Sequence, residues 1–153
     1  MRIALFICII ISLASCGPEI YYQETFEVEE LGWSYQDTLV FTPQIKETDR
    51  LNNIHLTVEH SPEYSYQNIY FKIKTVFPDS TIMEERLSVD LADGKGLWYG
   101  KCNSQSCHLK IYLLENFKFP EQGEYSFAIS QVTRKELLPG VQSLKFELVE
   151  SEG

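Results

Sequence analysis

The chain has 153 residues, and its 22 acidic and 13 basic side chains give a formal net charge of −9 at neutral pH. It contains no cluster of lysine and arginine, which excludes nucleic acid as a partner. The length corresponds to about one domain, large enough to fold around its own core without metals or disulfides.

The N-terminus has the pattern of a lipoprotein signal peptide. Arg2 supplies a positive charge, residues 3–11 form an apolar run, and Leu13-Ala14-Ser15-Cys16 follows as a lipobox. The run is shorter than the roughly 20 residues that a membrane-spanning helix needs. We therefore expect residues 1–15 to be removed and the thiol of Cys16 to be lipidated, with palmitate among its acyl groups. An ordinary secretory signal with an incidental cysteine is the alternative.

The anchor has consequences for location. Residues 16–24 are expected to form a lipidated tether, and residues 25–153 the folded domain. Eight residues from Gly17 to Glu24 span at most about 25–30 Å, which keeps the domain close to its membrane. Position 17 is not the aspartate that retains lipoproteins in the inner membrane, and only Glu19 adds charge nearby. These features predict the outer membrane, at its periplasmic face.

The rest of the chain alternates between apolar and polar residues with a period of two, which is typical of half-buried β-strands. Clear alternation covers residues 54–58, 69–73, 87–91, 109–113, 125–129 and 144–148, with weaker candidates at 26–28 and 39–41. Turn residues such as Pro78-Asp79-Ser80 and Pro139-Gly140 separate the segments. We expect a single antiparallel β-sandwich of eight or nine strands, immunoglobulin-like or jelly-roll-like.

A short motif opens the strand at 125–129. The spacing Glu121-x-Gly123-x-Tyr125 places a turn glycine two residues before an inward tyrosine. This is the sequence pattern of the tyrosine corner of immunoglobulin-like sandwiches. The same spacing also arises by chance.

Of the four cysteines, Cys8 is expected to be removed with the signal segment and Cys16 to be lipidated, so Cys102 and Cys107 remain. In an oxidising compartment they could close a hairpin tip as a disulfide. Free thiols are one alternative, and a zinc site with His108, which would have only three ligands, is another. Because the closed loop is small, a disulfide here is expected to add little stability.

The sequence contains no recognisable catalytic constellation. His55 falls on the polar face of a strand, where a solvated imidazole is expected, and no serine lies in a nucleophile elbow. Asp90-x-x-Asp93-Gly94 lacks the alternating ligands of a calcium loop. Exposed strand faces account for the many carboxylates, so we expect neither an enzyme nor a cofactor.

Two aromatic loops are the candidate partner-binding residues. Trp98 and Tyr99 follow a glycine-rich turn, and Tyr64 and Tyr66 lie in Tyr64-x-Tyr66-x-Asn68. Large aromatics on open loops could anchor a protein or stack on a sugar. The alternative is a core tryptophan around which its neighbours turn.

An ordered set of landmarks accompanies the lipobox. They are Phe26, Trp33, Tyr64-x-Tyr66-x-Asn68, Leu91-Ala92-Asp93, Gly96-x-Trp98-x-Gly100, Phe119-x-x-x-Gly123-x-Tyr125, Gln131, Arg134, Leu138, Gly140 and Val141. In this set the chain resembles the gliding motility lipoprotein GldH family of the Bacteroidota.

The resemblance implies a non-enzymatic assembly or scaffolding component of the gliding machinery, which is linked to type IX secretion. It also implies other gliding lipoproteins and secretion-associated periplasmic ring proteins as partners, and no small-molecule substrate. The alternative is a glycan-binding surface lipoprotein that uses Trp98, Tyr99, Tyr64 and Tyr66 as an exposed aromatic platform.

Overall fold

The computed structural model describes residues 18–151, so the signal segment and Cys16 lie outside the described residues. Within this range the chain forms β-strands and no helix. The long strands are β1 (Ile20–Glu27), β3 (Thr38–Phe41), β5 (Asn52–His60), β6 (Asn68–Val76), β7 (Ile82–Asp90), β9 (Cys107–Phe117), β11 (Ser126–Gln131) and β13 (Val141–Glu150). Two-residue strands lie between them, namely β2 (Trp33–Ser34), β4 (Gln44–Ile45), β8 (Lys101–Cys102), β10 (Gly123–Glu124) and β12 (Leu137–Leu138).

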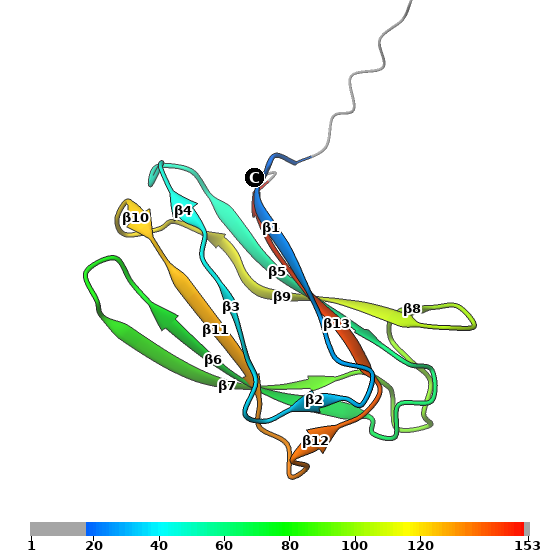
Figure 1. Ribbon diagram of the computed structural model, residues 1–153. Coiled ribbons are helices and arrows are strands. Elements are labelled where there is room, and N and C mark those ends of the chain that lie inside the picture. The colour runs from blue at the N-terminus through cyan, green and yellow to red at the C-terminus, as the bar shows by residue number, and fades with distance from the viewer. Residues whose placement is uncertain (1–17, 152–153) are drawn as a thin grey trace, which may run out of the picture.

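The long strands form two antiparallel sheets that face each other (Figure 1). One sheet has the order β1-β13-β5-β9 with β8 at its edge, and the other has the order β3-β11-β6-β7. With the eight long strands numbered along the chain, these orders read 1-8-3-6 and 2-7-4-5, which is the topology of a jelly roll. The predicted antiparallel sandwich is confirmed, and its strand order is that of the jelly roll, not of the immunoglobulin fold.

The core lies between the sheets, where the apolar side of each predicted alternation points inward. Leu56 and Phe146 are fully buried and pair across β5 and β13. The ring of Phe146 stacks on Phe41 at 4.9 Å and contacts Phe127 at 5.1 Å, both from the opposite sheet. Aromatic contacts of this kind add to the hydrophobic stabilisation of the two layers.

The first strand begins earlier than the sequence predicted. Residues 20–24, which we expected to belong to the tether, form the first half of β1 and pair with the end of β13. The physical reason is that Tyr22 packs edge-on against Phe146 at 6.1 Å, which gives this half of the strand an inward anchor. Only three residues, 17–19, then lie between Cys16 and Ile20.

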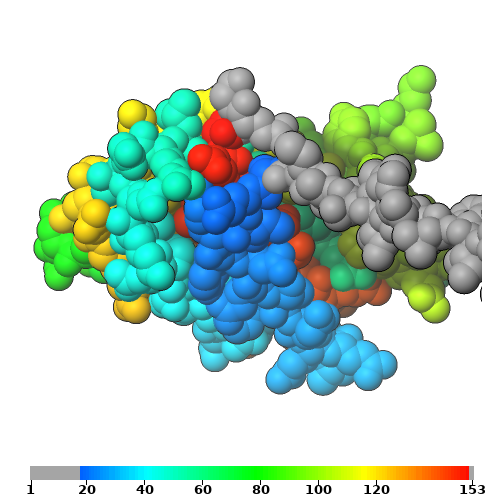
Figure 2. All heavy atoms as spheres, turned by 90° about the horizontal axis from the view of Figure 1, so that it is seen from above, coloured from blue at the N-terminus to red at the C-terminus, as the bar shows by residue number. Residues whose placement is uncertain are grey.

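The sandwich has two ends with different contents. We call the end nearest the N-terminus of the described chain the proximal end; it holds the start of β1, the end of β13 and the segment 42–51. Figure 2 shows this end from above, with β1 in blue beside the last strand in red. The distal end holds segments 61–67, 91–99 and 132–140, because β5, β7 and β11 all run toward it. The two ends are the top and bottom of the molecule in Figure 1.

Tyr125 has the contacts of a tyrosine corner, although the fold is a jelly roll. Its side chain is buried, and its hydroxyl donates to the carbonyl oxygen of Glu121 at 3.1 Å. Gly123 has a φ of 136°, and a Cβ there would lie 2.7 Å from the ring of Pro78. Glycine is therefore required at this position for both conformation and space.

The expectation of a solvated His55 is wrong. The side chain is only 6% exposed, and its ring meets Tyr112 edge-on at 4.5 Å. The reason is its place on β5, which has β13 on one side and β9 on the other, so outward side chains of both neighbours cover it. Burial lowers the pKa of His55, and the nearby charge of Lys110 lowers it further.

Candidate functional site

The two aromatic loops of the sequence lie side by side at the distal end. The carbonyl oxygen of Gln67 accepts hydrogen bonds from the backbone amides of Leu91 at 2.7 Å and Ala92 at 3.1 Å. The side-chain amide of Gln67 donates to the carbonyl oxygen of Asp93 at 3.1 Å. Residues 61–67 and 91–100 therefore form one connected surface.

Asp93 organises the turn that carries Trp98. One of its carboxylate oxygens accepts hydrogen bonds from the amides of Lys95 at 2.8 Å and Leu97 at 2.9 Å. The turn closes through a bridge between Ala92 and Trp98. This carboxylate thus has a structural role in the turn.

Trp98 and Tyr64 are the inner members of the candidate set. Trp98 is partly buried against the core, and its ring lies edge-on to His60 with centroids 4.6 Å apart. Tyr64 is 5% exposed, and its hydroxyl donates to the carbonyl oxygen of Asn68 at 3.3 Å. Burial raises the pKa of Tyr64. A Cβ on Gly140 would lie 3.2 Å from its ring, so glycine keeps the space for this tyrosine.

Tyr66 and Tyr99 are the outer members. Tyr66 is 37% exposed and Tyr99 is 59% exposed. The ring of Tyr66 stands at 73° to that of Tyr64, with centroids 5.6 Å apart. The structure therefore brings the four predicted residues to one end of the fold but divides them into two supporting rings and two accessible rings.

His60 lies beneath this surface and was not singled out from the sequence. It is fully buried, and its Nδ1 lies 2.9 Å from the carbonyl oxygen of Ser61. A carbonyl can only accept, so Nδ1 carries the proton. Burial lowers the pKa of His60 and favours the neutral ring. A signal was present in the sequence, because His60 continues the inward positions Ile54, Leu56 and Val58.

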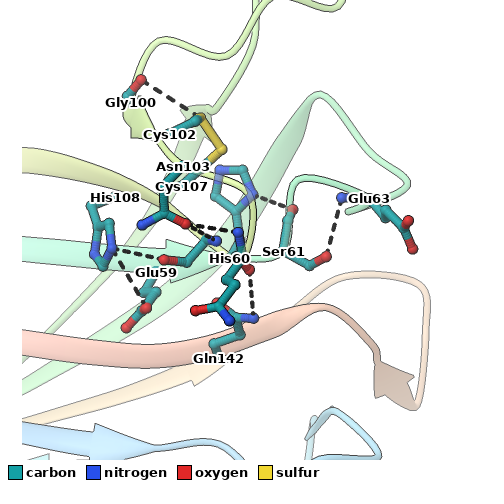
Figure 3. The surroundings of a disulfide bond; sticks show 12 residues. Glu59, His60, Ser61, Glu63, Gly100, Cys102, Asn103, Cys107, His108 and Gln142 are labelled. Carbon is teal, nitrogen blue, oxygen red and sulfur yellow. Dashed lines mark hydrogen bonds and ion pairs between the residues drawn. A yellow bond between two sulfur atoms is a disulfide. The ribbon is translucent and has the colours of Figure 1, made fainter.

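Cys102 and Cys107 are joined as a disulfide at the β8–β9 hairpin (Figure 3). The side-chain oxygen of Asn103 accepts hydrogen bonds from the amides of Gln105 at 2.7 Å and Ser106 at 2.8 Å, so the tip is also held by an Asx turn. Both thiols are consumed by the bond and do not serve as zinc ligands.

His108, the third residue of the zinc alternative, contacts other groups. Its Nε2 lies 2.9 Å from the hydroxyl of Ser106 and 3.6 Å from a carboxylate oxygen of Glu59 (Figure 3). Among the described residues no cluster of three or more histidine, cysteine or acidic side chains is arranged to hold a metal ion.

Gln131 is a second buried polar residue that the sequence reasoning did not interpret. It is 1% exposed, and its side-chain nitrogen donates to the carbonyl oxygens of Trp33 at 3.3 Å and Lys135 at 3.0 Å. Its side-chain oxygen accepts from the amide of Thr133 at 2.9 Å. One side chain thus fixes the conformation of the loop that follows β11.

The fold and this site together define a single jelly-roll domain with an accessible aromatic surface at the end opposite the start of its first strand. The chain belongs to the GldH lipoprotein family, whose model matches residues 20–148. The predicted family resemblance is confirmed. The family is that of a lipoprotein and is not known as a family of enzymes. Membership implies attachment to a membrane through lipid, and no helix within residues 18–151 is long and apolar enough to cross one.

Two relatives illustrate the family. The chain is 27% identical to the gliding motility lipoprotein GldH homolog of Christiangramia forsetii, over 92% of this chain and 86% of the relative. It is 22% identical to the gliding motility lipoprotein GldH of Flavobacterium johnsoniae, over 88% of this chain and 84% of the relative. Among solved structures, an arabinose-bound α-L-arabinofuranosidase is similar over 82% of this chain and 19% of the enzyme's chain, at 13% identity. The TM-score of 0.39 is too low to establish a common fold.

Proposed function

We propose that this protein is a lipid-anchored component of the gliding machinery that holds partner proteins at its distal end. The names of both relatives support a role in gliding motility. The proposal includes the finer expectations from the sequence, namely the periplasmic face of the outer membrane and a link to type IX secretion. Its expected partners are other gliding lipoproteins and proteins of the secretion-associated periplasmic ring.

The observation that carries the proposal is the placement of Tyr66 and Tyr99. The four residue steps from Cys16 to Ile20 span at most about 14 Å when fully extended, so the proximal end would lie at the membrane. Nine residues of β5 then separate the two ends by about 30 Å. The exposed rings would therefore point away from the membrane, where another protein can reach them.

The support beneath these rings favours a protein partner over a glycan. Tyr66 stands edge-on to Tyr64, and Tyr64 is buried, so the rings do not form the flat exposed row that a sugar platform needs. Exposed tyrosines on fixed loops are typical anchors of protein interfaces, because little side-chain entropy is lost on binding. Glycan binding remains the second candidate, since Tyr99 alone is 59% exposed.

Photo-crosslinking in cells tests the proposal. Benzoylphenylalanine replaces Tyr99 in one variant and Tyr112, which is 55% exposed on the outer face of β9, in a control variant. We expect gliding and secretion-ring proteins to be crosslinked from position 99 and not from position 112. Recovery of glycan-import proteins would favour the second candidate, and equal recovery from both positions would contradict the proposed site.

A further inference from the structure

A groove of about 560 Å³ opens beside the aromatic surface at the distal end. We call it the distal groove. One wall is formed by Tyr66 and Tyr70, and the other by Thr133, Arg134 and Lys135. We propose that the distal groove binds an acidic peptide segment of a protein partner, a proposal that rests on the docking function above and names the chemistry of the partner.

The charges of the groove oppose those of the whole chain. Acidic side chains outnumber basic ones by 22 to 13 in the sequence, yet the groove lining contains Arg134 and Lys135 and no aspartate or glutamate. Within residues 18–151 neither cationic side chain takes part in an ion pair or a side-chain hydrogen bond. Two adjacent cations without a partner are therefore available to a carboxylate, which arginine binds through two parallel hydrogen bonds.

The cationic wall has a fixed backbone. Gln131 holds the carbonyl oxygen of Lys135 at 3.0 Å and the amide of Thr133 at 2.9 Å from inside the fold. The amide of Val132 donates to the carbonyl oxygen of Tyr70 at 2.9 Å, which ties this wall to the opposite one. A preorganised loop loses less conformational entropy on binding than a free one does.

The opposite wall is aromatic. Tyr66 is 37% exposed and Tyr70 is 45% exposed, and the hydroxyl of Tyr70 accepts a hydrogen bond from the side chain of Asn68 at 3.0 Å. Buried Tyr64 forms the floor. A peptide that places a carboxylate on Arg134 can therefore rest an apolar or aromatic side chain on the tyrosines.

Side chains of the distal groove would hold the acidic peptide segment of the partner; the segment would not bind by pairing as an additional strand of the sheet. The groove lies along the start of β6, and β6 is paired on both sides, with β11 and with β7. It therefore offers no free strand edge to a partner. The net negative charge of the chain repels an acidic partner at long range, but salt screens such repulsion beyond about 8 Å at physiological ionic strength. Contacts inside the groove then decide the affinity.

Binding of two charged copolymers to the full chain in detergent tests the proposal. We expect a glutamate–tyrosine copolymer to bind and a lysine–tyrosine copolymer of equal length to bind at least about 10-fold more weakly, which corresponds to about 1.4 kcal/mol. In the variant Arg134→Glu the affinity for the acidic copolymer should fall at least about 10-fold. The control Lys101→Glu, which makes the same charge change at an exposed site on β8, should lower it less than about 2-fold.

Three outcomes would overturn the proposal. They are equal binding of both copolymers, equal losses in the two variants, and stronger binding of polygalacturonate, which would identify an acidic glycan as the occupant. Crosslinking from position 99 does not depend on this chemistry. If it still recovers gliding proteins, only the acidic-peptide proposal fails, and if it recovers none, the docking function itself fails.

Discussion

Replacement of Trp98 by alanine separates a supporting role for this residue from direct contact with a partner. The indole is partly buried, with its ring centroid 4.6 Å from that of His60 and 6.5 Å from that of Tyr64, and it makes no hydrogen bond within residues 18–151. Full truncation of a buried tryptophan costs about 3–5 kcal/mol, so partial burial places this loss at about 3 kcal/mol. For a domain of this size we expect the melting temperature to fall by about 10 °C.

The matched control is Tyr99→Ala, because Tyr99 is the next residue and is 59% exposed. Its effect on the free energy of unfolding should be within about 0.5 kcal/mol. Urea unfolding followed by circular dichroism measures both variants, and Trp98→Phe should recover most of the loss. If Trp98→Ala were as stable as Tyr99→Ala, our interpretation of Trp98 as a support for the outer rings would be refuted.

Three further predictions concern stability. Replacing Cys102 and Cys107 by serine should cost at most about 2 kcal/mol, because the closed loop is short; a larger loss in urea unfolding would contradict this estimate. Burial lowers the pKa of His60, so only the unfolded chain gains a proton there as the pH falls below about 6.5, and stability should decline. His60→Phe should reduce this decline without abolishing it, because His55 contributes in the same direction, and an unchanged decline would show that His60 does not contribute. Tyr125→Phe removes one hydrogen bond and should lower the free energy of unfolding by about 1 kcal/mol, measured against wild type at neutral pH.

The strands were predictable because each has one face in the core. The period of two at residues 54–58 and 144–148 reports that face directly, and both segments lie within long strands, β5 and β13. The order of the strands was not predictable in the same way, because it depends on which distant segments share a sheet. The motif around Tyr125 illustrates the difference between local and long-range structure. Its hydrogen bond to Glu121 joins residues four apart, so it forms in this jelly roll as it does in immunoglobulin-like sandwiches and does not report the strand order.

The residues of the candidate site could be predicted from the sequence, but which of their side chains are buried and which are exposed could not. Tyr64 and Tyr66 are two residues apart in sequence, yet one is 5% exposed and the other 37%. The contacts that bury Tyr64 come from the distant Gly140 and Trp98. Gln131 did carry a local signal, since it continues the inward positions of β11, where a polar side chain needs buried partners.

The topology also bears on how a lipid-anchored domain would carry a pull from a partner. β1 begins at the proximal end and pairs with β13 along its length, from Ile20 opposite Val149 to Glu27 opposite Ser143. A pull between the membrane and the distal groove would act along the axis of β1, so the hydrogen bonds of this ladder would share the load in shear. Arg50 adds to the same junction, because its guanidinium donates to the hydroxyl of Tyr21 at 2.9 Å and lies 3.6 Å from Glu150 at the end of β13. The strand that leads to the anchor is thus joined to the last strand of the fold, and β13 pairs in turn with the central strand β5.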